Sequence, residues 1–139
     1  MSVEQNKAIA RQFISLWGNG SLDIIDNLAD ASFSSYYPAF PRIIQGGAMF
    51  RKVIQGFRAA FSDLNCQIDE EIAEDDKVVI RWSFSAMHKG SFLGFPATNK
   101  HVKWTGITIF HIVNGKVVQE RGEEDYLGYL RQIGAISQG

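Results

Sequence analysis

The sequence predicts an α+β fold, a cone-shaped barrel in which a curved mixed or antiparallel sheet wraps around N-terminal helices. Three long strand patterns occupy the last third of the chain, at Lys77–His88, His101–Val113 and Lys116–Glu124. Two amphipathic helical segments precede them and a short one follows, an order typical of the α+β class. Asn114-Gly115 joins the last two strands, and it favours a tight hairpin because both central residues of a type I′ turn need a positive φ. Such a cone should enclose an apolar hollow.

Composition limits the function classes. A chain of 139 residues, 45% hydrophobic and 21% charged, predicts a single domain over residues 1–139 with its own core. The formal net charge of -1 gives no global field that would recruit nucleic acid or anionic lipid. No apolar run reaches membrane-span length, and the N-terminus lacks the apolar region of a signal peptide. Cys66 is the single cysteine and the histidines are scattered, which argues against a disulfide or a zinc site. We therefore expect a cytoplasmic protein.

The N-terminal segments carry helix signals. Ser2 and Gln5 form a capping box, and Gly18 and Gly20 end the helix that it opens. The apolar side of this helix repeats at helical spacing in Ile9, Phe13, Leu16 and Trp17. Ser21 is placed to cap a second, short helix.

A short strand and a third helix are expected next. Phe33 to Tyr37 has a strand pattern that Pro38 ends. Gly46-Gly47 opens a helix with an apolar stripe made of Phe50, Val53, Ile54, Phe57 and Phe61. We interpret this stripe mainly as core packing, although some of its rings could floor a pocket.

The following strand alternates apolar with polar residues, its apolar set being Leu64, Cys66, Ile68 and Ile72. Glu70 falls on the apolar face unless a bulge shifts the register. We expect Glu70 to form a structural ion pair with Arg81 on the next strand.

The long strands have distinct faces. The inner face of Lys77–His88 is Val78, Ile80, Trp82, Phe84, Ala86 and His88. The loop after it is unusually apolar at Phe92, Leu93 and Phe95, which is typical of a segment over a cavity mouth or an interface. The strand His101–Val113 is apolar on both faces, with Ile107, Ile109 and Val113 on the outer one. A homodimer through the outer sheet face would bury these side chains.

The last strand places Val118, Glu120, Gly122 and Glu124 on one face. Asp125 is a good N-cap for a closing helix. We expect the apolar side of that helix to be Leu127, Leu130 and Ile133.

Motifs spread along nearly the whole chain carry a family resemblance: Asn6-Lys7 through Leu16-Trp17, Gly20-Ser21-Leu22-Asp23, Phe61-Ser62-Asp63-Leu64, Ala73 through Trp82, His88 through Gly94, Trp104-Thr105-Gly106, Asn114-Gly115-Lys116-Val117, and Asp125-Tyr126-Leu127-Gly128 with Leu130 and Gly134. In these spacings the sequence resembles the NTF2-like superfamily, most closely the SnoaL-like polyketide cyclases. The resemblance implies an α+β barrel around an apolar pocket, usually dimeric. It also implies ring closure by intramolecular aldol condensation without a metal or a cofactor.

The same resemblance implies an acid/base aspartate near the end of the final strand and a helping histidine on the neighbouring strand. These positions fall at Gly122 and near Thr108 in this chain. The scaffold is therefore expected, but the acid/base pair is not in its usual place.

Glu120 and His88 are the catalytic candidates. Glu120 shares a face with Gly122, and a carboxylate in an apolar cavity has a raised pKa that suits a general base. The alternative is a surface glutamate at a strand end or one paired with a cation. His88 could donate to a ligand carbonyl or exchange a proton, or else be a hydrogen-bonded histidine at the rim. We expect Glu124 to be solvated or part of the helix entry.

Aromatic residues are the candidates for the pocket wall. One phenol of Tyr36 or Tyr37 could point into the hollow and bind an oxyanion or carbonyl, or be core. Thr108 and Gly106 are small and leave room beside larger rings. The predicted ligand-binding set is Trp17, Tyr36, Tyr37, Phe57, Trp82, Phe95, Trp104 and Thr108.

Three hypotheses remain open. The first is a cofactor-independent enzyme that performs acid/base chemistry of the aldol or enolisation type on a hydrophobic small molecule. The second is a non-catalytic ligand-binding or dimerising module. The third and weakest is an epoxide or ester hydrolase on the same barrel.

Overall fold

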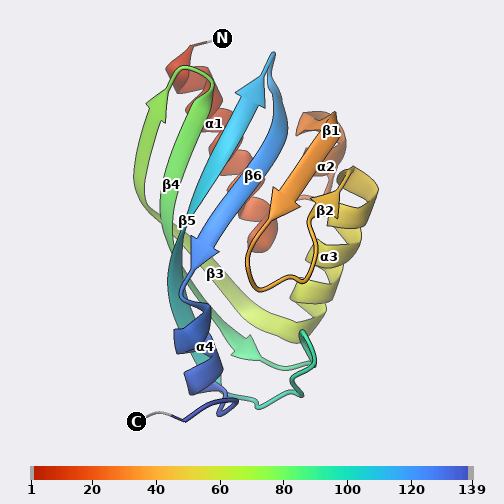
Figure 1. Cartoon of the computed structure of the whole chain (residues 1–139), viewed down its shortest axis with the longest axis vertical. Helices are drawn as coiled ribbons and strands as arrows, with labels where there is room; N and C mark the ends of the chain where they lie inside the picture. Colours follow the sequence, from red (N-terminus) through yellow and green to blue (C-terminus); the bar gives the residue numbers. More distant parts are fainter. Residues whose placement is uncertain (1, 138–139) are drawn as a thin grey trace.

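A computed structural model describes residues 2–137 and confirms the α+β class (Figure 1). A curved sheet of six strands in the order β2-β1-β6-β5-β4-β3 wraps around the N-terminal helices. Neighbouring strands are antiparallel except β1 and β6, which run parallel. The elements are α1 (Val3–Ile14), η1 (Ser15–Trp17), α2 (Asp23–Leu28), β1 (Ala29–Tyr36), β2 (Ile44–Gln45), α3 (Gly47–Ala60), β3 (Phe61–Glu74), β4 (Lys77–His88), β5 (His101–Val113), β6 (Lys116–Glu124) and α4 (Tyr126–Gln132).

The predicted capping box at the start of α1 is confirmed. Ser2 Oγ accepts from the Gln5 backbone N–H at 3.1 Å and Gln5 Oε1 accepts from Ser2 N–H at 2.8 Å, which completes the capping box. A side-chain cap of this kind stabilises a helix by about 1 kcal/mol. The predicted Ser21 cap of α2 is wrong, because Leu22 occupies the cap position without a side-chain cap and Ser21 lies one residue before it. Ser21 Oγ still accepts from the N–H of Asp23, the first residue of α2.

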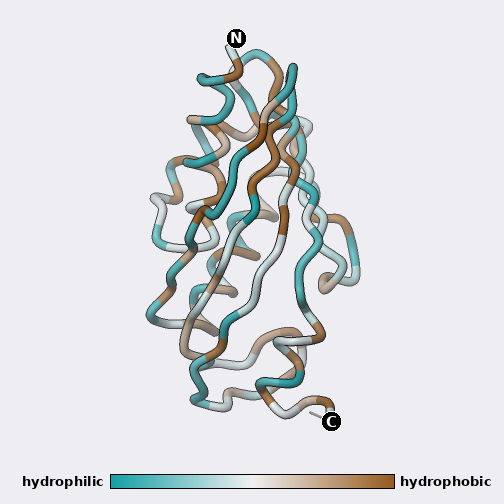
Figure 2. Tube along the Cα trace, turned by 90° about the vertical axis from the view of Figure 1, so that its left-hand side faces the viewer, coloured by the Kyte–Doolittle hydropathy of each residue, from teal (hydrophilic) through white to brown (hydrophobic). Residues whose placement is uncertain are grey.

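The Asn114-Gly115 hairpin is also confirmed, since the two residues have φ of 50° and 78°. It joins β5 to β6, and β4 pairs with β5 from Lys77 opposite His111 to Met87 opposite His101. Hydrophobic and hydrophilic residues are interspersed along the chain (Figure 2). Burial alternates along β4, as expected for a sheet with one face packed against helices.

A β-bulge near the end of β3 reverses which side chains point inward and which point outward. Its register shifts between Ile68 and Glu70, so two consecutive residues point outward. Ile72, which the alternation placed inside, is therefore 62% exposed. The expected Glu70–Arg81 ion pair is wrong, because Arg81 instead contacts Asp69 Oδ2 at 3.4 Å.

A second bulge changes β6. Its register against β5 shifts between His111 and Ile112, which leaves one extra residue in β6. Val117 is fully buried in place of the predicted Val118. Glu120 and Gly122 still point inward, because they follow the bulge.

Two aromatic clusters fill the space between the sheet and the helices. One joins Phe13, Phe33, Phe50 and Phe110. The other joins Phe57, Phe61, Phe84, Trp104 and Tyr129. Trp17 contacts Phe50 of the first and Phe57 of the second, so the core is continuous.

The sequence pattern of β5 suggested that both of its faces are buried, but apolar side chains on its outer face are exposed to solvent. Ile107 is 44% exposed and Val113 is 39% exposed in the single chain. The homodimer that would cover them stays a prediction. Within residues 2–137, no helix has the length and apolar character needed to cross a membrane.

Candidate functional site

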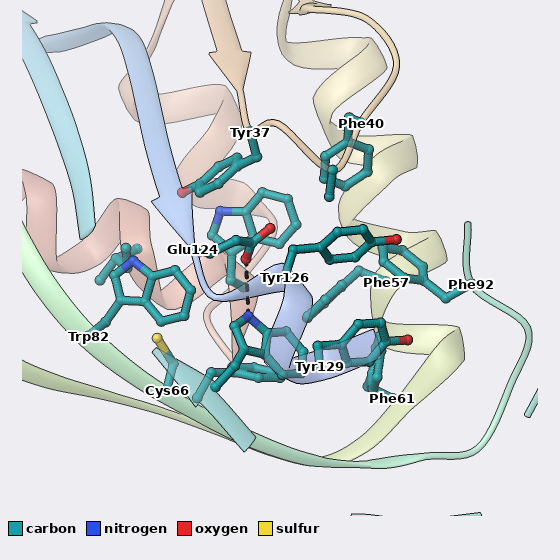
Figure 3. Close-up of a pocket in the computed structure, with 15 residues that line it drawn as sticks. Tyr37, Phe40, Phe57, Phe61, Cys66, Trp82, Phe92, Glu124, Tyr126 and Tyr129 are labelled. Atoms are coloured by element: carbon teal, nitrogen blue, oxygen red, sulfur yellow. Dashed lines mark hydrogen bonds between the residues drawn. The ribbon is translucent and has the colours of Figure 1, made fainter. Parts of the chain in front are cut away.

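A narrow cavity of about 50 Å³ lies between the inner face of the sheet and α3, with α4 beside it (Figure 3). Its walls are mainly aromatic, and every strand of the sheet from β3 to β6 contributes at least one residue. The lining residues are Ile14, Trp17, Tyr37, Ala39, Phe40, Phe57, Phe61, Cys66, Trp82, Phe84, Phe92, Trp104, Glu124, Tyr126 and Tyr129. The space suffices for a few small atoms, whereas drug-sized ligands occupy roughly 300–1,000 Å³. A polycyclic ligand would need the walls to move apart.

Five residues of the predicted ligand-binding set line this cavity: Trp17, Tyr37, Phe57, Trp82 and Trp104. The structure places the other three outside it. Tyr36 is 39% exposed, because the alternation of β1 turns it to the opposite side from its neighbour Ser35. Phe95 bonds to Phe92 through the backbone, and Phe92 is the ring that reaches the cavity. Thr108 is fully buried behind the wall.

Glu120 is fully buried, and a hydrogen-bonded network holds it. Tyr37 Oη donates to Glu120 Oε2 at 2.8 Å, and Trp17 Nε1 donates to the same oxygen at 3.2 Å. Thr108 Oγ1 lies 2.8 Å from Tyr37 Oη and accepts from Trp82 Nε1 at 3.0 Å. Because the one phenolic proton goes to Glu120, Thr108 must donate to Tyr37. The directions of all four hydrogen bonds are thereby set.

Burial raises the pKa of Glu120 to about 7, although the hydrogen bonds from Tyr37 and Trp17 act in the opposite direction. The second oxygen, Oε1, is buried without a hydrogen-bond partner in the described chain. The Oγ of Ser35, its register neighbour on β1, is also without one. Glu120 can therefore gain or lose a proton near neutral pH.

The Tyr37 ring separates Glu120 from the cavity. A Cβ atom added at Gly122 would lie 1.9 Å from Tyr37 Cε1, so the ring rests directly on the glycine. Tyr37 lines the cavity and Glu120 does not. A side chain at position 122 and the Tyr37 ring exclude each other, which explains why this strand carries a glycine among its inward positions.

Glu124 lines the cavity, whereas the sequence predicted a solvated residue or one at the entry to the closing helix. It does directly precede the Asp125 cap of α4. Trp104 Nε1 donates to Glu124 Oε2 at 3.0 Å (Figure 3). Burial raises the pKa of this carboxyl, and the indole hydrogen bond opposes the rise. The sequence pattern missed this because α4 packs back over the strand end.

The closing helix contributes two more unpredicted residues, Tyr126 and Tyr129. Their spacing of three places both rings on one side of α4, where they stack at 5.7 Å. Leu127, expected to be buried, is 52% exposed. The aromatic i, i+3 pair was the signal that could have identified the buried side.

His88 does not meet Glu120. It is fully buried against Phe61, with ring centroids 5.3 Å apart, and it does not line the cavity. Its Nδ1 lies 3.0 Å from Thr98 Oγ1, and its Nε2 is buried without a partner in the described chain. Burial lowers the pKa of His88, which favours the neutral ring.

The described residues offer neither an activated cysteine nor a cluster of metal ligands. Burial raises the pKa of Cys66 to about 11, so its thiol is protonated at neutral pH although it lines the cavity. No group of three or more His, Cys, Asp or Glu residues in the chain from 2 to 137 is arranged to hold a metal ion.

Comparison with known proteins gives a consistent result. The family model described as SnoaL-like polyketide cyclase matches residues 7–133. The aklanonic acid methyl ester cyclase DnrD of Streptomyces peucetius is 29% identical over 93 residues, which are 66% of this chain and 63% of that protein. The nogalonic acid methyl ester cyclase of Streptomyces nogalater is 24% identical over 123 residues, 87% of this chain and 91% of the relative. The match thus spans less than two thirds of the first of these relatives.

The fold is shared with solved structures as well. The structure of TsrD from Streptomyces laurentii superposes with a TM-score of 0.85 at 27% identity. That superposition covers 98% of this chain and 99% of the other.

Proposed function

The chain belongs to the SnoaL-like polyketide cyclase family, and we propose on that premise that it catalyses cofactor-independent acid/base chemistry of the aldol type on a hydrophobic small molecule. The observation that supports this most is the buried Glu120–Tyr37 pair. Glu120 has a pKa of about 7 from burial, and Tyr37 joins it to the cavity through a 2.8 Å hydrogen bond. A proton acceptor with a pKa near the working pH is well matched to general acid/base catalysis.

In this proposal Glu120 is the proton acceptor, and the Tyr37 hydroxyl relays the proton between the ligand and Glu120. Burial and the nearby Glu120 hold the pKa of Tyr37 well above its usual range, so the phenol stays neutral. Its hydroxyl can take a proton from the ligand while it passes its own to Glu120, and the reverse transfer protonates a ligand oxygen. His88, the other residue predicted as catalytic, is left out because it is packed behind Phe61.

The experiment uses the compounds that the relatives' names give. Purified protein is incubated with aklanonic acid methyl ester and with nogalonic acid methyl ester, and cyclised product is measured by chromatography. Glu120→Gln keeps the shape of the side chain but cannot accept the proton, so we expect kcat to fall by about 100-fold or more. Glu123→Gln is the matched control, because Glu123 is exposed on the opposite face of the same strand. Unchanged turnover in Glu120→Gln would remove this residue from the mechanism.

A non-catalytic binding module is the second candidate. Gly122 carries no carboxylate, and Tyr37 and Trp17 cover Glu120 from the cavity. Saturable quenching of tryptophan fluorescence by both esters, without any product, would favour this function. The hydrolase hypothesis has no comparable support, since no arginine lines the cavity in the described chain. The homodimer and the cytoplasmic location stay predictions.

A further inference from the structure

Two carboxylates lie close to the cavity, but only one of them can contact a ligand directly. Glu120 is reached only through Tyr37, which covers it together with Trp17. Glu124 is itself part of the wall, and among the described lining residues it is the sole carboxylate. A ligand in the cavity would therefore touch Glu124 directly.

The backbone holds Glu124 in a defined place. Its Cα is in register with Gly106 on β5, near the end of β6. The next residue, Asp125, donates its N–H to Thr105 O at 2.9 Å and accepts from Gly128 N–H at 2.9 Å as the cap of α4. Strand pairing on one side and the helix cap on the other thus restrict where the carboxylate can move. Such restriction is what proton transfer to a positioned ligand requires.

The surroundings of Glu124 favour the acceptance of a proton. Within residues 2–137, Trp104 Nε1 is the side-chain donor to this carboxylate, at 3.0 Å from Oε2. Among the described residues, no lysine, arginine or histidine lines the cavity beside the carboxylate. The same lack of positive charge disfavours an anionic ligand, whose own charge would be desolvated beside Glu124. The aromatic walls suit a flat, uncharged molecule.

We infer that Glu124 is a second catalytic residue, which takes a proton from carbon in an uncharged ligand whose acidic C–H lies next to a carbonyl. This inference rests on the proposed function. It assigns the proton on carbon to Glu124 and the proton on oxygen to the Tyr37–Glu120 pair. One oxygen of Glu124 gains the proton, the C–H electron pair forms the enolate double bond, and the carbonyl π pair moves to oxygen. The Tyr37–Glu120 pair donates a proton to the carbonyl oxygen of the ligand, where the negative charge develops. The enolate carbon then attacks a second carbonyl of the same molecule, whose π pair moves to its oxygen. Glu124 returns its proton to that alkoxide, so no other reactant is needed.

The test uses 5-nitrobenzisoxazole, an uncharged planar aromatic probe of desolvated bases. A base removes the proton from C3 of the isoxazole ring, the C–H pair completes the nitrile, the N–O bond breaks, and the ring opens to a coloured cyanophenolate. We expect the full chain to accelerate this elimination and Glu124→Gln to lose about 100-fold of the rate. Glu123→Gln, the exposed neighbour, should stay within about twofold, since Glu123 does not touch the probe. Glu120→Gln should lower the rate less than Glu124→Gln, because Glu120 acts only through Tyr37 on the oxygen that leaves.

A pH profile separates a catalytic role from a structural one. The Trp104 indole stabilises the charged form of Glu124, so Trp104→Phe should move the midpoint of the rate profile to higher pH. Glu124→Gln should abolish the profile while its near-ultraviolet circular dichroism and thermal midpoint stay near those of the unmodified chain.

Other outcomes would overturn the inference in distinguishable ways. A loss of rate in Glu120→Gln, with Glu124→Gln unaffected, would reject Glu124 and leave the proposed function standing. Equal rates in the unmodified chain and both variants, at probe concentrations that quench tryptophan fluorescence, would reject both. A probe that causes no quenching at saturation would reject the stated ligand class.

Discussion

Burial raises the pKa of Glu120 to about 7, against the opposing effect of hydrogen-bonding neighbours that include Tyr37 and Trp17. The group therefore binds its proton more tightly in the folded chain than in the unfolded one, whose pKa is 4.5. Below about pH 4.5 both states are protonated and the difference contributes nothing. As the pH rises through the interval up to about 7, the unfolded state gains an advantage, because it releases the proton more readily.

This residue-scale linkage gives a prediction for stability. The contribution of Glu120 to the free energy of unfolding should fall by roughly 3 kcal/mol between about pH 4.5 and pH 7, and change little above that. Glu120→Gln removes the titration, so the stability of the unmodified chain relative to this variant should decline over that interval. Urea denaturation at several pH values measures it. Parallel stability curves for the two proteins would show that Glu120 does not titrate there, and Glu123→Gln controls for the loss of one negative charge.

Tyr37 both packs against Gly122 and binds Glu120. Its ring occupies the space that a side chain at Gly122 would need, with only 1.9 Å between Tyr37 Cε1 and an added Cβ. Its hydroxyl binds Glu120 and Thr108 at 2.8 Å each. One residue therefore supplies both the packing and the polar contact at this point of the wall, and its loss should disturb both.

At the scale of elements, two connections meet at the cavity. Phe40, between β1 and β2, and Phe92, between β4 and β5, have ring centroids 6.1 Å apart and both line the cavity. Phe92 also contacts Phe57 and Phe61 at 5.4 Å. Because the cavity measures about 50 Å³, a larger ligand must displace side chains to enter. Rings carried by connections between elements move at lower cost than rings on paired strands.

We therefore predict that Phe92→Ala enlarges the cavity and speeds the binding of a neutral aromatic ligand such as 1-aminoanthracene by about tenfold or more. Stopped-flow fluorescence gives the association rate. Phe95→Ala is the matched control, since Phe95 lies in the same loop and does not line the cavity. Equal association rates in the two variants would contradict a gating role for Phe92.

At the scale of the whole molecule, the outer sheet face raises the question of assembly. Ile107 is 44% exposed and Val113 39% exposed on β5, and Ile72 is 62% exposed on β3. Apolar side chains gathered on one face of a sheet typically mark an interaction surface. A second copy of the chain would bury them.

Ile107→Lys should therefore shift the protein from dimer to monomer, because a charge at the centre of an apolar interface is costly to desolvate. Size-exclusion chromatography with light scattering measures the mass. Ile43→Lys provides the control, since Ile43 is 50% exposed but lies in the connection between β1 and β2. A monomer for the unmodified chain at micromolar concentration would refute the prediction, as would an equal effect of both substitutions.

Local patterns in the sequence determined the elements and one central orientation. The capping box at Ser2, the Asn114-Gly115 turn and the Asp125 cap are short-range signals, and each is present in the structure. The alternation of β6 correctly turned Glu120 and Gly122 inward. These features depend on residues within a few positions of one another, and so the sequence contains them.

Only the tertiary structure decided how those parts form a site. Bulges changed the orientation of Ile72 and Val117, because an extra residue reverses the alternation of side chains on one side of the bulge relative to the other. The Tyr37 ring came to cover Glu120 from 83 residues away in the chain. The packing of α4 turned Glu124 from an expected surface residue into part of the cavity wall. Burial, and with it the pKa of each carboxyl, depends on which distant segments pack over a residue, and no local period in the sequence specifies that.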